Sequence, residues 1–253
     1  MIVYTRPPYP DIQYPYVIVN LFDETSIRHI RRAKSVIIDS GVYSVFSRLS
    51  LDEYPGGYVR WIHKATTWWH KIKVAVPETY VTVPDYPADY RHNIVADNVD
   101  KTIRNIEHAV KRHPQVRWII PIQGQYNNVL SLVKTFEYIS DIGILDTYNY
   151  IAIANVCTSK DPKFIHDSVV LIHKRVKHLE KKKGKQIKIH VFGPSINTWK
   201  LIAPYADSAD AIVTNYWCLP IFGKMCTKRE EKLKAWEIFL NKVKEVETID
   251  RKD

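Results

Sequence analysis

Three aspartates stand at the ends of apolar runs, where a chain that only has to turn needs no ionisable group. Asp39 ends "VIID" (36–39), Asp85 ends "YVTVPD" (80–85), and Asp210 stands at one end of "DAIVTN" (210–215). Carboxylates gathered in one site repel each other, which raises the pKa of at least one of them and suits it to donate a proton. These residues are therefore candidates for acid–base chemistry.

Small residues and amides follow the apolar runs in the same way. If the runs are parallel strands of a barrel, their C-terminal ends meet at one mouth, which is where barrel enzymes have their active sites. The residues at these ends are Ser40, Gly41, Gln123, Gly124, Asn155 and Gly193.

The apolar runs also predict the fold. They are continuously apolar rather than alternating, as in parallel strands covered on both faces, and helical patterns fill most of the gaps. This alternation predicts a single-domain (β/α)8 TIM-type barrel over residues 1–253 with a C-terminal amphipathic helix; a doubly wound open sheet is the alternative. The runs are 16–21, 35–41, 72–78, 80–85, 117–124, 150–157, 187–194 and 210–215.

Helix signals lie between the runs. A cap region of Asp, Thr and Ser opens the segment 23–34, and the segment 161–184 ends at Gly184, a typical residue at a helix C-terminus. Trp68 and Trp69 are expected to pack a helix onto the barrel rather than to form a platform for nucleic acid. In the segment 98–113 one apolar stripe is predicted from Val99, Ile103, Ile106 and Val110.

The net charge is +10 and the isoelectric point is about 9.3. Such a charge suits a polyanionic partner, because neutralising phosphates releases counterions. Basic residues cluster in 108–114, 174–185 and 228–234, and we expect these helices around the barrel mouth to contact phosphates. The alternative is that they are solvated helix faces.

The cysteine content and the hydropathy bear on the compartment. Cys157, Cys218 and Cys226 are too few and too scattered for a disulfide framework, so a reducing cytoplasm is the expected location. No apolar run approaches the roughly 20 residues that a membrane helix needs, and the N-terminus lacks a signal pattern. The sequence leaves open whether the chain is a monomer or a homodimer.

Five segments, in order, resemble the tRNA-guanine transglycosylase family. The first is the most specific, because it resembles the family's Asp-Ser-Gly-Gly-Phe-Gln-Val-Phe-Ser stretch and differs at three positions. The set covers most of the chain, from about residue 35 to about residue 217. The segments are "DSGVYSVFS" (39–47), "VTVPDYPAD" (81–89), "PIQGQ" (121–125), "HVFGPSI" (190–196) and "SADAIVTN" (208–215).

The resemblance implies a base-exchange glycosyltransferase. It would replace guanine in a nucleic acid, with DNA favoured and tRNA as the alternative, and would use a 7-deazaguanine base as co-substrate and no cofactor. Exchange with retention at C1′ is most simply explained by two displacements through a covalent intermediate. The resemblance assigns the nucleophile to Asp210 and the general acid/base to Asp39. Base binding is expected at Ser40, Gly41, Asp85, Gln123, Gly124, Asn155 and Gly193, and Tyr43 or Tyr86 is a candidate to stack on the flat base.

The chain departs from the family pattern at its end. The family holds zinc with three closely spaced cysteines and a later histidine, whereas Cys218 and Cys226 have seven residues between them and no histidine follows His190. We therefore expect no structural zinc. The chain also stops soon after the barrel, which is similar to the compact relatives that modify DNA.

Each assignment has a structural alternative. Asp39 could cap the following helix, and Asp207 could replace Asp210 as the functional acid. Asp85 could be a turn residue, and Gln123 could satisfy buried backbone groups. His190, on an apolar run, is expected to be a hydrogen-bonded core residue rather than a ligand.

Two other functions fit the sequence. A non-catalytic nucleic-acid-binding protein of the same fold would keep the charge but not the reaction. A barrel enzyme acting on a small phosphorylated metabolite would also use the charge, but a phosphate site calls for glycine near the last strands. The segment "NYWCLP" (215–220) has none.

Overall fold

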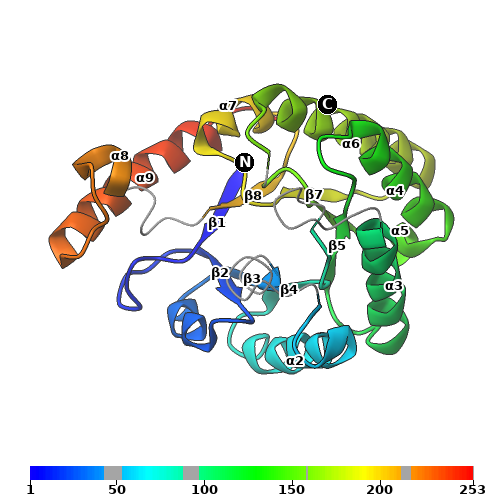
Figure 1. Cartoon of the computed structure of the whole chain (residues 1–253), viewed down its shortest axis with the longest axis horizontal. Helices are drawn as coiled ribbons and strands as arrows, with labels where there is room; N and C mark the ends of the chain where they lie inside the picture. Colours follow the sequence, from blue (N-terminus) through cyan, green and yellow to red (C-terminus); the bar gives the residue numbers. More distant parts are fainter. Residues whose placement is uncertain (43–52, 88–96, 158, 212–217, 253) are drawn as a thin grey trace.

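The computed structural model describes residues 1–42, 53–87, 97–157, 159–211 and 218–252. Its eight strands are all parallel and close into a barrel in the chain order β1 to β8, with β8 pairing back onto β1 (Figure 1). The predicted (β/α)8 barrel is therefore confirmed. The strands are β1 (Ile2–Thr5), β2 (Tyr16–Asn20), β3 (Ser35–Asp39), β4 (Glu78–Thr82), β5 (Trp118–Ile122), β6 (Tyr150–Ile153), β7 (Lys188–Val191) and β8 (Ser208–Ala211).

The sequence predicted one strand that does not form and missed another. The predicted total of eight strands was therefore still right. The segment 72–78 was expected to be a strand, but Ile72 ends a helix and the Lys73 N–H donates to Trp69 O (2.9 Å), so the chain still turns there. Val74 is 83% exposed, so its side chain is not packed against the barrel. Strand β1 was missed because its four residues give too short an apolar signal.

The helices surround the strands. Asp23 caps η1 by accepting the Thr25 N–H, and Gly184 ends α6 in the left-handed conformation, both as predicted. Trp68 and Trp69 of α2 are buried against the barrel, also as predicted. The helices are η1 (Glu24–Ile30), α2 (Gly57–Ile72), α3 (Asp97–Arg112), α4 (Val129–Asp141), α5 (Ile144–Thr147), α6 (Pro162–Lys183), η3 (Ile196–Thr198), α7 (Trp199–Ile202), α8 (Cys218–Phe222) and α9 (Arg229–Glu247).

Helix α3 turns a different face to the barrel from the one predicted. Of the expected stripe only Ile106 is fully buried, while Val99, Ile103 and Val110 are partly exposed. The buried face instead carries polar residues, which bond to the chain after β4. Hydropathy periodicity alone does not predict which face of a helix is buried when that face is polar. The buried polar residues are Asn98, Thr102 and Asn105.

The C-terminal segment lies beside the barrel next to β1 and α7 (Figure 1). In α9, Trp236 and Phe239 stack on each other and pack with Trp199 of α7. Cys218 and Cys226 form a disulfide that joins α8 to the turn before α9. The two cysteines that the sequence treats as unpaired are thus bonded, because the turn brings their Cα atoms within 5.4 Å.

The interior of the barrel is filled by side chains that alternate along the strands. Tyr4, Ile37, Ile119 and Tyr150 form one buried layer inside the strands. A larger cluster lies between the strands and the surrounding helices. In the described part of the chain, no helix combines the length and apolar character needed to cross a membrane.

Candidate active site

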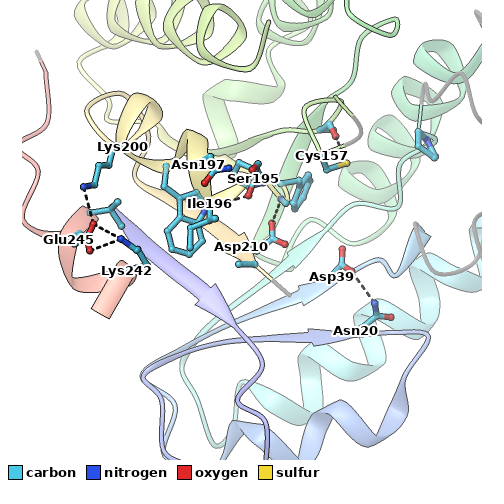
Figure 2. A pocket seen from close by; sticks show the side chains of 18 of the residues that line it. Asn20, Asp39, Cys157, Ser195, Ile196, Asn197, Lys200, Asp210, Lys242 and Glu245 are labelled. Carbon is cyan, nitrogen blue, oxygen red and sulfur yellow. Dashed lines mark hydrogen bonds and ion pairs between the residues drawn. The ribbon is translucent and has the colours of Figure 1, made fainter. Parts of the chain in front are cut away.

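A cavity of about 1050 Å³ opens at the C-terminal ends of the strands. Asp39, Asp85 and Asp210 all line it, as does Asn20 at the end of β2. Figure 2 shows Asp39 and Asp210 in the same hollow, on strands that β1 and β2 separate in the barrel wall. The three aspartates that the sequence places at the ends of apolar runs therefore do meet.

Asp39 is the last residue of β3, and its carboxylate is held by neighbours on both sides. Asn20 Nδ2 donates to Asp39 Oδ2 (3.3 Å), and the Gly41 N–H donates to the same oxygen (3.2 Å). Burial, and then the negative charges of Asp210 and Asp85, raise the pKa of Asp39 to about 7. The carboxyl group can therefore both give and take a proton near neutral pH.

Gly41 lets the chain leave β3 without covering the carboxylate. Its φ of +71° lies in the left-handed region, which residues with a Cβ adopt at a cost. A Cβ here would lie only 2.4 Å from Asn20 Oδ1. Glycine is thus needed for the close approach to Asn20, and through it for the position of Asp39.

Asp85 lies in the segment that follows β4, and α3 fixes that segment by its polar face. Asn105 Nδ2 donates to Pro84 O (2.7 Å), and Asn98 Nδ2 donates to Pro87 O (2.6 Å). The Tyr86 N–H donates to Thr102 Oγ1 (2.9 Å). These bonds satisfy backbone groups that no strand partner reaches, and they rigidify the loop.

The Asp85 side chain is 5% exposed and interacts with residues of two other strand ends. Ser40 makes a side-chain hydrogen bond to it, and Gln123 Nε2 donates to Oδ2 (3.2 Å). Burial raises the pKa of Asp85 to about 7 in spite of these hydrogen bonds. Asp85 is therefore not an exposed turn residue, because its side chain is buried in the site.

Asp210 is the third residue of β8, and its side chain is 14% exposed. The Gly193 N–H donates to Asp210 Oδ1 (2.8 Å), and His190 Nε2 lies 3.2 Å from the same oxygen. Asp207, the alternative acid, precedes β8 at the opposite end of the barrel. There it accepts the Ile189 N–H and pairs with Arg251, so it is not part of the mouth.

Gln123 and Gly124 are in the site, but their groups serve the protein itself. Gln123 is fully buried, and its amide donates to Asp85 Oδ2 and to Tyr86 O (2.9 Å). A Cβ on Gly124 would lie 2.9 Å from the backbone nitrogen of Leu132, so this glycine lets α4 approach. In the structure, Gln123 positions Asp85 and Gly124 serves packing.

The other expected base-binding residues differ in their positions. Asn155 is 2% exposed, and its Nδ2 donates to Gln125 O (3.1 Å). Gly193 lines the cavity with a φ of +49° and supplies its N–H to Asp210. Tyr43 lies outside the described residues.

Two residues of the site, Asn20 and His190, were not predicted from the sequence to be there. Asn20 ends "YVIVN" (16–20), and the same rule that singled out Asp39 would have found it at a strand end. His190 was expected to be a hydrogen-bonded core residue. It is completely buried and hydrogen-bonded, as expected, but one of its partners is Asp210.

Two of the three basic clusters, 108–114 and 174–185, lie away from the mouth, whereas Arg229 and Lys232 of the third cluster lie near the loops that follow β1 and β2. Helices α3 and α6 return the chain to the start of the next strand, so their basic C-terminal turns lie at the opposite end of the barrel. There Lys183 pairs with Asp146. At the cavity, Lys200 and Lys242 both pair with Glu245 (Figure 2).

No group of three or more His, Cys, Asp or Glu side chains suited to a metal ion occurs among the residues that the structure describes. Cys218 and Cys226, the sulfur ligands that a zinc site would need, are bonded to each other.

No family model and no curated protein sequence matches this chain. Among solved structures it is similar to the carboxyl transferase domain from Rhizobium etli pyruvate carboxylase with pyruvate. The identity is 12% and the TM-score is 0.30, over 83% of this chain and 41% of that chain. The chain thus spans less than half the length of that structure, and the likeness carries no information about function.

Proposed function

We propose that this protein is a base-exchange glycosyltransferase that replaces guanine in a nucleic acid with a 7-deazaguanine. The proposal rests on one observation: Asp39 and Asp210 face one cavity, but their surroundings differ. The pKa of Asp39 is raised to about 7 by burial and neighbouring charge, whereas the oxygen of Asp210 that accepts a backbone N–H also lies 3.2 Å from the buried imidazole of His190. Two carboxyl groups in unlike environments suit a proton carrier and a nucleophile.

In the first displacement, an oxygen of Asp210 would attack C1′ and form a C1′–O bond. The C1′–N bond breaks, its electron pair leaves with the base, and Asp39 gives that base its proton. In the second displacement, a nitrogen of the incoming base attacks C1′. The C1′–O bond breaks, Asp210 regains its charge, and Asp39 takes the proton that the incoming base loses. Two inversions give retention.

Asp85 is the group best placed to recognise the base. Its carboxylate can accept hydrogen bonds from the N1–H and the exocyclic amine of guanine, which 7-deazaguanines also carry. Gln123 and Ser40 hold this carboxylate, and α3 holds its backbone. A rigidly held acceptor supports selection of one base.

A nucleic-acid substrate is favoured by the charge of +10 and by Lys200 and Lys242 at the cavity. A target base has to leave the stack to reach a cavity of this kind, so unpaired guanines should react best.

The test is exchange of radiolabelled guanine out of DNA and out of tRNA, run side by side, with trapping of the covalent adduct. Asp210→Asn should keep nucleic-acid binding and lose the adduct, since an amide is a poor nucleophile. Asp39→Asn should slow exchange by about 10²–10⁴-fold, as expected when a positioned acid/base is removed.

Asp207→Asn is the matched control, because it makes the same change next to the same strand but at the other end of the barrel. It should still form adduct. Loss of adduct in Asp207→Asn but not in Asp210→Asn would overturn the assignment of the nucleophile. Wild-type protein that binds but exchanges no base in either nucleic acid would favour a binding protein instead.

A further inference from the structure

Behind Asp210, a line of hydrogen-bonded side chains runs through the interior of the barrel. Tyr150 Oη lies 2.6 Å from Ser208 Oγ, Ser208 Oγ lies 2.8 Å from His190 Nδ1, and His190 Nε2 lies 3.2 Å from Asp210 Oδ1. Tyr150, Ser208 and His190 are each at most 4% exposed. The line thus connects the buried layer of the barrel with the candidate nucleophile.

The register of the barrel produces this line. His190 of β7 pairs with Ser208 of β8, so the two residues lie in one layer. Because side chains alternate along a strand, Asp210 points inward like Ser208, one layer nearer the mouth. Tyr4, Tyr150 and Phe192 enclose the imidazole edge-on, with ring centroids between 5.1 and 6.3 Å away.

For a neutral His190, the hydrogen-bonding capacities of the groups give the line one direction. If His190 Nδ1 carried the proton, the lone pair of Nε2 would face the Asp210 carboxylate, and the two acceptors would repel. If Ser208 donates to Nδ1, then Nε2–H donates to Asp210, and the Tyr150 hydroxyl can donate to Ser208. Burial raises the pKa of Tyr150 well above its usual value, which keeps that hydroxyl protonated. Every donor then points towards Asp210.

Both donors to Asp210 among the described residues reach the same oxygen. His190 Nε2 and the Gly193 N–H converge on Oδ1. These two bonds restrain rotation of the carboxylate, and within the described part of the chain no hydrogen bond reaches Oδ2. During attack by Oδ2, Oδ1 becomes the carbonyl oxygen of the ester and can keep both bonds; when the ester breaks, the same bonds stabilise the returning charge.

We propose that His190 is a positioning residue, which together with Ser208 and Tyr150 holds Asp210 so that Oδ2 faces the sugar. This inference rests on the proposed function for its catalytic meaning, but the hydrogen-bonded line can be tested without any activity.

The direct readout is the tautomer of His190 in ¹⁵N-histidine-labelled protein, with its signals assigned through His190→Gln. We expect Nε2 to carry the proton and Nδ1 to accept. Ser208→Ala should shift the Nδ1 signal and release the tautomer. Ser35→Ala is the matched control: Ser35 is equally buried and bonds to Tyr4 (2.8 Å), but not to His190, so it should leave the tautomer of His190 unchanged.

The second readout is the rate of adduct formation with a guanine-containing oligonucleotide. His190→Leu should slow it by about 10- to 100-fold, as expected for loss of one hydrogen bond to a charged group. His190→Gln retains an N–H donor and should recover part of the rate. Ser208→Ala should be slower than Ser35→Ala.

An Nδ1–H tautomer in the wild-type protein, or a wild-type rate of adduct formation in His190→Leu, would overturn the inference. If the wild-type protein forms no adduct at all, the proposed function and the catalytic role of His190 both fall. The tautomer still decides in that case whether the line of hydrogen bonds exists, so the two failures are distinguishable.

Discussion

Asn20 and Asp39 are paired across β2 and β3, and the Asn20 amide donates to the Asp39 carboxylate over 3.3 Å. The last residues of two adjacent strands are thus joined at the mouth. Since Asn20 Oδ1 also accepts the Phe22 N–H (2.8 Å), the amide can present only its NH₂ side to Asp39. Asn20 thereby favours the charged form of an acid whose pKa is raised by burial and by the charges of Asp210 and Asp85.

Asn20→Ala should therefore raise the pKa of Asp39 further above its usual value. The pH at which base exchange is fastest should move upward, and the rate at neutral pH should change with it. The pH–rate profile is the measurement. Asn197→Ala, which removes an exposed amide from the same cavity, should leave the profile in place. An unchanged profile in Asn20→Ala would contradict this role.

Gly41→Ala should destabilise the protein more than Gly57→Ala does. Both glycines have positive φ, +71° and +81°, so the backbone strain is similar and amounts to about 1–2 kcal/mol. A Cβ at Gly57 meets nothing within 4 Å, whereas at Gly41 it meets Asn20 Oδ1. Urea unfolding should show an additional loss of about 1–3 kcal/mol in Gly41→Ala. Equal losses would mean that the contact with Asn20 is easily relieved.

The buried carboxyl groups should make stability depend on pH. Because the pKa of Asp85 is raised to about 7 in the folded state, its protonated form favours folding, and this stability is lost as pH rises through about 7. Asp85→Asn should remove that loss. The difference in free energy of unfolding, variant minus wild type, should therefore increase by about 2–3 kcal/mol between pH 5 and pH 8.

The difference between variant and wild type is the quantity to measure, because other groups act in the opposite direction. Burial lowers the pKa values of His29, His113 and His173, so their contribution to stability is present above about pH 6.5 and lost in acid. These contributions cancel in the difference. A difference that is constant with pH would show that Asp85 titrates normally.

Reducing the Cys218–Cys226 disulfide should lower the melting temperature. The bond closes a short loop, with a sequence separation of 8, and its loss should cost about 2–3 kcal/mol. Dithiothreitol should therefore destabilise the wild type but not a Cys218→Ala/Cys226→Ala variant. Mass spectrometry of alkylated protein before and after reduction counts the free thiols. A wild-type protein that is fully alkylated without reduction would contradict the bond.

If nucleic acid enters at the mouth, charges there should matter more than charges on the far face. Lys200→Ala/Lys242→Ala should weaken binding and reduce the slope of log K against log salt by up to about 2, since roughly 0.9 is lost per phosphate contact. Lys181→Ala/Lys182→Ala removes the same charge at the end of α6 and is the control. A larger effect of the α6 pair would place the nucleic acid on the opposite face of the barrel.

The sequence by itself determined which segments form most of the barrel and that Asp39 ends one of its strands. Continuous apolar runs report burial on both faces, and a carboxylate directly after such a run, as at Asp39, marks a strand end. Caps such as Asp23 and stops such as Gly184 are also local, because the bonds that they make lie within a few residues. These features depend on near neighbours in the chain and can be read from it.

Only the tertiary structure decided how distant residues combine. The register of β7 against β8 places His190 beside Ser208, and a shift of one residue would have turned Asp210 away from the interior. From the sequence alone, the polar face of α3 is expected to be exposed to solvent. In the structure it is buried, because its asparagine side chains donate to Pro84 O and Pro87 O. The basic ends of α3 and α6 face away from the mouth because each of these helices must return the chain to the start of the next strand. Pairings across the barrel depend on closure of the whole sheet, and no local pattern encodes them.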